Sequence, residues 1–172
     1  GQDHSNGCFC DNALSPAARL SLPDCCSQFN TDKLGLLKGL GFNRISLGIQ
    51  DFDPKVQEIV HRVQTEEQVD TVVRHARKLG FQSINFDLIY GLPKQTLAGF
   101  ARTLDIVIDA RPERIAIYGY AHMPQIFKPQ KQIKVEDLAT PETRLKLLGL
   151  TIDKLSEAGY VYIGMDHFAL PD

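Results

Sequence analysis

One unit recurs along this chain: the apolar end of a helix, a glycine, an aromatic residue and the start of an apolar strand. It occurs at Leu40-Gly41-Phe42 and Leu79-Gly80-Phe81 and, with alanine and tyrosine, at Ala158-Gly159-Tyr160. A glycine ends a helix readily because it adopts the left-handed conformation at little steric cost. Helices that alternate in this way with short strands predict an α/β fold with a parallel sheet.

The alternation of side chains predicts four parallel strands, near residues 44–50, 84–90, 115–120 and 160–165. Each of the first two strands has one apolar face and one small or polar face, which carries Ser46, Gly48 and Gln50 in one strand and Asn85, Asp87 and Ile89 in the other. Asp87 lies near the C-terminal end of its strand, where ligands bind in parallel α/β proteins. We therefore predict a ligand site there; the alternative is an edge strand with one solvated face. An open doubly wound sheet and part of a (βα) barrel both satisfy the pattern.

Helix starts are marked by local chemistry. Asp53-Pro54 and Thr140-Pro141 each pair an N-cap residue with a proline at the first helical position. Thr65 and Gln68 form a capping box. A further helix is predicted from about Thr96 to Ala110, and the polar segment from Gln125 to Ala139 is predicted to be an extended loop.

Composition excludes several classes of function. A net charge of −2 gives no electrostatic footprint for nucleic acid or for an anionic membrane. No apolar run approaches the roughly 20 residues of a membrane span, and no signal peptide is recognisable, so we expect a cytoplasmic protein without a nucleic-acid or membrane partner. The absence of a Gly-x-Gly-x-x-Gly or Walker A sequence argues against nucleotide binding through a phosphate loop.

The first 29 residues have no sustained periodicity and are predicted to be an irregular leader, with at most a short helical turn between Ala13 and Leu22. All four cysteines lie within this segment, at Cys8, Cys10, Cys25 and Cys26. Their spacing matches no common zinc or iron–sulfur motif, so we predict no metal ligands in this chain.

Four segments resemble a known family. The segment 41–52 is similar to the fourth barrel strand of radical S-adenosylmethionine enzymes, and 85–96 is similar to their fifth. Segments 120–124 and 164–169 narrow the resemblance to the oxygen-independent coproporphyrinogen III oxidases, also called coproporphyrinogen dehydrogenases. The resemblance implies that residues 30–172 form the C-terminal half of a radical SAM (βα) barrel, with parallel strands and outer helices.

The resemblance also implies a reaction. Family members oxidatively decarboxylate coproporphyrinogen III to protoporphyrinogen IX in haem biosynthesis, without oxygen. A [4Fe-4S] cluster cleaves S-adenosylmethionine to a 5′-deoxyadenosyl radical, which removes hydrogen from a substrate propionate. The sequence does not identify the electron donor.

Carried over position by position, the resemblance implies contacts to S-adenosylmethionine from Gln50, Arg62, Asp87 and Ala121, with Ile89 lining the same pocket. Two of these residues have simpler interpretations: Arg62 could be only a partner of a helix dipole, and Gln50 could satisfy backbone groups at a strand end. His122 and His167 also lie at strand ends, but a structural role is equally consistent with their positions, and neither is assigned a catalytic role.

One departure from the family pattern is pronounced. The C-x-x-x-C-x-x-C sequence that supplies the cluster ligands does not occur here, and neither does the glycine-rich motif of the second strand. A second interpretation therefore stays open, in which the chain is a non-enzymatic remnant or a module that, like the related haem chaperones, binds S-adenosylmethionine or a tetrapyrrole.

Overall fold

The computed structural model describes residues 19–22 and 31–171. The strands are β1 (Arg19–Leu22), β2 (Arg44–Gln50), β3 (Ser83–Tyr90), β4 (Arg114–Gly119), β5 (Val161–Gly164) and β6 (His167–Ala169). The α-helices are α1 (Thr31–Gly39), α2 (Pro54–Ile59), α3 (Glu66–Lys78), α4 (Leu97–Ala110) and α5 (Pro141–Glu157). The segment predicted as an extended loop contains two short 3₁₀ helices, η2 (Lys128–Gln132) and η3 (Val135–Asp137).

The strands form one mixed sheet in the order β1-β2-β3-β4-β6-β5. Strands β1 to β4 are parallel to their neighbours, so the predicted α/β class and the parallel pairing of the first two predicted strands are confirmed. Strand β6 is antiparallel both to β4 and to β5.

The prediction for the last strand is wrong in one respect. Residues 161–164 do form a strand, but the chain then turns back through Met165 and Asp166, and β6 inserts between β4 and β5. Both turn residues have positive φ, 49° and 62°, as a hairpin turn of type I′ requires. The usual Asn-Gly signal for such a turn is absent from this position, so the sequence pattern did not reveal the hairpin.

The predicted irregular leader contains a strand. Strand β1 pairs in parallel with β2, in a register that sets Arg19 beside Arg44 and Leu22 beside Leu47. The prediction of irregular structure, or of a helical turn, is therefore wrong for residues 19–22. A strand of four residues is too short to produce a recognisable period in sequence. The four cysteines lie outside the described residues.

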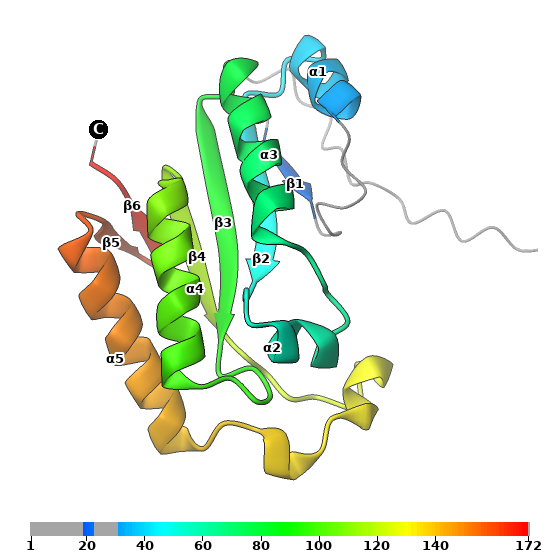
Figure 1. The fold of residues 1–172 in the computed structure, drawn as a ribbon, viewed down its shortest axis with the longest axis vertical. Helices are drawn as coiled ribbons and strands as arrows, with labels where there is room; N and C mark the ends of the chain where they lie inside the picture. Colours follow the sequence, from blue (N-terminus) through cyan, green and yellow to red (C-terminus); the bar gives the residue numbers. More distant parts are fainter. Residues whose placement is uncertain (1–18, 23–30, 172) are drawn as a thin grey trace, which may run out of the picture.

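Helices α3, α4 and α5 lie side by side against one face of the sheet (Figure 1). The core fills the space between these layers, and its largest fully buried side chains are Phe86, Phe100, Leu34, Ile45, Leu47, Ile49, Ile84, Leu88, Leu104, Ile115, Ile117 and Leu147. The strand members of this set alternate with Ser46, Asn85 and Asp87, which occupy the opposite face, as the sequence predicted.

Local capping chemistry forms as predicted. In α3 the Thr65 hydroxyl accepts a hydrogen bond from Gln68 N–H at 3.2 Å, and the Gln68 side chain accepts one from Thr65 N–H at 2.9 Å. Asp53, Thr96 and Thr140 cap α2, α4 and α5. Within the described part of the chain, no helix has the length and apolar character needed to span a membrane.

Candidate functional site

A cavity of about 210 Å³ lies at the carboxyl ends of β2 and β3. Its lining residues come from the end of β2, the end of α2 and the turn after it, the end of β3 and the loop that follows, and the segment 120–133. They are Gln50, Ile59, Val60, His61, Arg62, Ile89, Leu92, Tyr120, Pro129, Gln130 and Ile133. Three of the five predicted site residues, Gln50, Arg62 and Ile89, therefore line one cavity.

Gln50, the last residue of β2, has an unusual backbone conformation. Its φ is 64°, in the left-handed region that disfavours a residue with a side chain, and the pairing of β2 with β3 shifts register between Gly48 and Gln50. Its Oε1 is buried and accepts no hydrogen bond within the described residues. Because a buried amide oxygen without a donor costs free energy, this atom fits a site that receives a donor from a ligand.

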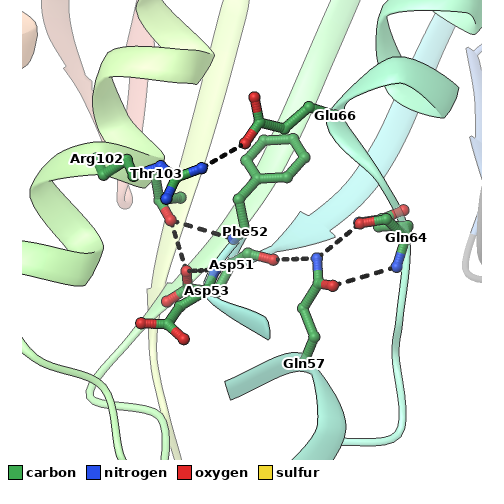
Figure 2. A network of polar contacts seen from close by, with 8 residues as sticks. All are labelled: Asp51, Phe52, Asp53, Gln57, Gln64, Glu66, Arg102 and Thr103. Carbon is green, nitrogen blue, oxygen red and sulfur yellow. Dashed lines mark hydrogen bonds and ion pairs between the residues drawn. The ribbon is translucent and has the colours of Figure 1, made fainter. Parts of the chain in front are cut away.

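Arg62 lies just beyond the C-terminal end of α2. Its backbone N–H donates to Gln57 O at 2.9 Å, and so holds the chain at the cavity wall. Gln57 is itself fixed, because its amide nitrogen donates to the carbonyl oxygens of Asp51 and Gln64, each at 2.9 Å (Figure 2). A guanidinium at this wall can bind a carboxylate through two parallel donors.

Asp87 is not among the residues that line the cavity. It lies two positions before Ile89 on the same face of β3, and its carboxylate accepts hydrogen bonds from Ser46 Oγ at 2.8 Å and from Asn85 Nδ2 at 2.7 Å. No ion pair joins Asp87 to Arg44 or to any other described cation. The carboxylate is therefore held by neutral donors of the sheet.

Ala121 lies beside the cavity, in the segment that follows β4. Its carbonyl accepts a hydrogen bond at 3.1 Å from the amide of Gln130, which lines the cavity. The preceding residue, Tyr120, also lines it, and its hydroxyl lies 3.2 Å from His122 Nδ1. Burial raises the pKa of the Tyr120 hydroxyl, which stays neutral at physiological pH.

A buried polar network, which sequence reasoning missed, connects the ends of β2 and β3 to α4. Asp51, with 1% of its surface exposed, accepts hydrogen bonds from Asp53 N–H and from Thr103 Oγ1 (Figure 2). Its carboxylate also accepts one from Gln95 Nε2. Burial raises the pKa of the Asp51 carboxyl above its ordinary value of 3.8, although these hydrogen bonds act in the opposite direction.

Gln95 completes this network on the side of β3. Its amide nitrogen also donates to Ile89 O at 3.0 Å, and its carbonyl accepts from Gly91 N–H at 2.6 Å and from Leu92 N–H at 3.3 Å. Gln64 holds the end of β2 in a similar way, because its amide nitrogen donates to Gly48 O at 3.1 Å and to Ile49 O at 2.8 Å. These two glutamines fix the backbone on which Gln50 and Ile89 project into the cavity. The sequence did not reveal the role of these two residues, because a buried glutamine in a loop has the same local sequence pattern as a solvent-exposed one.

A larger hollow of about 610 Å³ lies at the other end of the sheet, among residues that include Arg44, Arg114 and Val161. None of the five predicted site residues lines it. No group of three or more His, Cys, Asp or Glu residues suited to a metal ion occurs in the described part of the chain. The predicted site is therefore the smaller cavity at the carboxyl ends of the strands.

Comparison with known proteins assigns a family to this arrangement. Residues 18–107 match the family model described as the radical SAM superfamily. The oxygen-independent coproporphyrinogen III oxidase of Pseudomonas aeruginosa is 56% identical over 139 residues, which are 81% of this chain and 30% of that protein. The enzyme of the same name from Escherichia coli is 49% identical over 145 residues, 84% of this chain and 32% of that protein.

A solved structure agrees with these matches. Coproporphyrinogen III oxidase from Escherichia coli, described as a radical SAM enzyme, superposes with a TM-score of 0.84 at 46% sequence identity. The match covers 90% of this chain and 35% of that one. The chain thus spans about a third of the length of the relatives it matches.

Proposed function

We propose a function from the premise that this chain belongs to the radical SAM superfamily. The chain supplies one wall of the S-adenosylmethionine site of an oxygen-independent coproporphyrinogen III oxidase. Its close relatives carry that name, and family membership implies S-adenosylmethionine and a [4Fe-4S] cluster as cofactors.

One observation carries the proposal: Gln50, Arg62 and Ile89 come from three separate segments and line one cavity. The family resemblance, which rests on the sequence alone, had singled out these three among five residues. A purely structural role for each would not require them to converge. Their convergence at the carboxyl end of a parallel sheet supports a shared ligand.

The chemistry of the wall fits S-adenosylmethionine. Arg62 would bind the methionyl carboxylate, and the buried, unpartnered Oε1 of Gln50 would accept a hydrogen bond from the ammonium group. Ile89 offers apolar contact, and the backbone at Ala121 lies at the rim. Asp87, deeper on the same strand face, would accept hydrogen bonds from the ribose hydroxyls.

S-adenosylmethionine supplies, when it is bound and reductively cleaved, a 5′-deoxyadenosyl radical for hydrogen abstraction. The residues of this chain bind and orient the cofactor, and the apolar lining excludes water from it. The proposed overall reaction is the oxidative decarboxylation of coproporphyrinogen III to protoporphyrinogen IX. As part of the same proposal, it takes place in the cytoplasm without a nucleic-acid or membrane partner, in line with the net charge of −2.

A second function is favoured by one sequence observation. The chain lacks the C-x-x-x-C-x-x-C sequence of the cluster ligands. In this alternative it binds S-adenosylmethionine or a tetrapyrrole without catalysis. Both functions use the same cavity, and they differ in whether the chain acts together with a cluster.

The proposed binding is tested by titrating S-adenosylmethionine into the chain and following the backbone amide signals by NMR. Arg62→Ala should weaken affinity about tenfold or more, because the variant loses a charge-assisted bidentate contact worth about 1.5–3 kcal/mol. Arg74→Ala is the matched control, since Arg74 is an exposed arginine of α3 that pairs with Asp70 at 2.8 Å.

The control should bind as the unchanged chain does. No saturable binding to the unchanged chain, or equal loss in the two variants, would overturn the proposal. Equal loss would show that net charge, and not the position of Arg62, governs affinity.

A further inference from the structure

We infer that Ser46 and Asn85 are positioning residues, which together hold the Asp87 carboxylate in the orientation that receives a ribose diol. This inference rests on the proposed function, because it deepens the role of Asp87 in the same site. The three residues form a closed triad on the sheet face opposite the helices.

The triad is built by strand register. Ser46 of β2 is the registered partner of Asn85 of β3, and Asp87 follows Asn85 by two positions on the same face. The Ser46 hydroxyl donates to Asp87 Oδ2 at 2.8 Å, and Asn85 Nδ2 donates to Asp87 Oδ1 at 2.7 Å and to Ser46 Oγ at 2.8 Å. Each oxygen of the carboxylate is therefore held by a different side chain.

This arrangement uses every side-chain proton that the two supporting residues have. Ser46 has one hydroxyl proton and Asn85 Nδ2 has two, and all three point to acceptors within the triad. The amide of Asn85 cannot be reversed, since Oδ1 would then lie against a carboxylate oxygen. Both supporting side chains are buried, so their rotamers are restricted by packing as well as by hydrogen bonds.

The triad still has capacity for a ligand. A carboxylate offers about four acceptor positions, and the Ser46 and Asn85 donors occupy two of them. Asn85 Oδ1 is buried and has no hydrogen-bond partner within the described residues. Further acceptor positions on Asp87 beside a buried, unpartnered amide oxygen suit a ligand with two adjacent hydroxyl donors, which is the chemistry of a ribose diol.

The test compares two nucleosides as probes on the full chain. Adenosine has the diol, and 2′,3′-dideoxyadenosine lacks it. The unchanged chain should bind adenosine more tightly, and Ser46→Ala and Asn85→Ala should each lower that preference by roughly fivefold to tenfold, as expected for one misaligned hydrogen bond. Ser46→Thr, which keeps the hydroxyl, should restore it.

Thr151→Val is the control for the loss of a buried hydroxyl. Thr151 is buried in α5 and its Oγ1 donates to Leu147 O at 2.8 Å, away from the triad. The control variant should lose stability in a thermal melt but keep the full preference for adenosine. A preference lost equally in Thr151→Val and Ser46→Ala would contradict positioning and indicate a general loosening of the fold.

A double-mutant cycle separates this inference from the proposed function. In an Asp87→Ala background, Ser46→Ala should have no further effect on the preference, because the proposed effect of Ser46 on the diol passes through the carboxylate. If Asp87→Ala alone leaves affinity for S-adenosylmethionine and adenosine unchanged, the assigned role of Asp87 in the proposed function fails. If Asp87→Ala weakens binding but Ser46→Ala and Asn85→Ala do not, the positioning inference alone fails.

Discussion

Gln50 combines two unfavourable features at a single residue. Its φ is 64°, and its buried side-chain oxygen has no partner within the described part of the chain. Each feature costs free energy in the folded protein, and such costs concentrate at ligand sites, where the surrounding structure maintains them. The residue that the family motif singled out is thus also one that the backbone geometry marks as strained.

Gln50→Asn tests whether this strain serves binding. Asparagine tolerates the left-handed conformation better than glutamine does, and its amide ends one methylene shorter. We expect the free energy of unfolding, measured with urea, to stay equal or rise by a few tenths of a kcal/mol. Affinity for S-adenosylmethionine should fall at least several-fold. A variant that loses stability but keeps its affinity would make Gln50 a structural residue.

Asp51 should give the chain a characteristic pH dependence. Its pKa in the folded state is raised by burial above the ordinary value of 3.8, so the folded chain binds the proton more tightly than the unfolded chain does. The relevant pH window lies between the ordinary pKa of 3.8 and the raised pKa of Asp51 in the folded state. Within this window the folded state gains stability as the pH falls and loses it as the pH rises.

Asp51→Asn removes this titration. Urea unfolding of both proteins from about pH 4 to about pH 8 should show that the unchanged chain loses stability relative to the variant as pH rises. The hydrogen bonds that the substitution disturbs shift the variant's stability by a similar amount at each pH, so only the slope is diagnostic. The opposite slope would mean that the folded-state pKa of Asp51 is lowered.

At the scale of elements, most helices and strands were predictable because their signals are local. The capping box from Thr65 to Gln68 spans four residues, and each strand of the core shows its apolar face by simple alternation. The hairpin of β5 and β6 was missed because its turn residues, Met165 and Asp166, are not among those that usually mark such turns. Strand β1 was missed because it is recognised only by its pairing with β2.

The candidate site was predictable only in part, and for a related reason. Family motifs identified residues that line the cavity, but they did not identify the side chains that fix the cavity wall. The hydrogen bond from Gln95 to Asp51 joins residues 44 positions apart, and no local pattern reports such a pairing. The triad around Asp87 likewise depends on the register between β2 and β3.

The hydrogen bonds of Gln95 should contribute strongly to the stability of the strand ends. Gln95→Ala removes two donors and two acceptor contacts from buried partners, and should lower the free energy of unfolding by about 2–4 kcal/mol. Gln82→Ala, at an exposed glutamine, should change it by no more than about 0.5 kcal/mol. Equal effects in the two variants, measured by urea unfolding, would contradict a structural role for the network.

At the scale of the whole molecule, the sheet has two chemically different faces. Helices α3, α4 and α5 cover the apolar face (Figure 1). The other face carries the polar triad of Ser46, Asn85 and Asp87. This is the design of a (βα) barrel wall, whose inner face serves ligands. The chain spans about a third of its relatives, and it contains the strands that carry the predicted cofactor contacts.

The chain on its own should not assemble a [4Fe-4S] cluster. Such clusters need several cysteine thiolates at defined spacing, and the four cysteines here do not form the C-x-x-x-C-x-x-C sequence. Anaerobic reconstitution with iron and sulfide should leave no stoichiometric cluster absorbance. A stable cluster that disappears in a Cys8→Ala, Cys10→Ala double variant would disprove this prediction.

We propose that the carboxyl ends of β2 and β3, with the segments beside them, bind S-adenosylmethionine. The most direct measurement is a map of backbone amide shifts in the unchanged chain as this cofactor is added. We predict that the largest saturable shifts occur at Gln50, Arg62, Ile89 and Ala121. Shifts centred instead on Arg44 and Arg114, at the opposite end of the sheet, or an absence of saturable shifts, would contradict this claim.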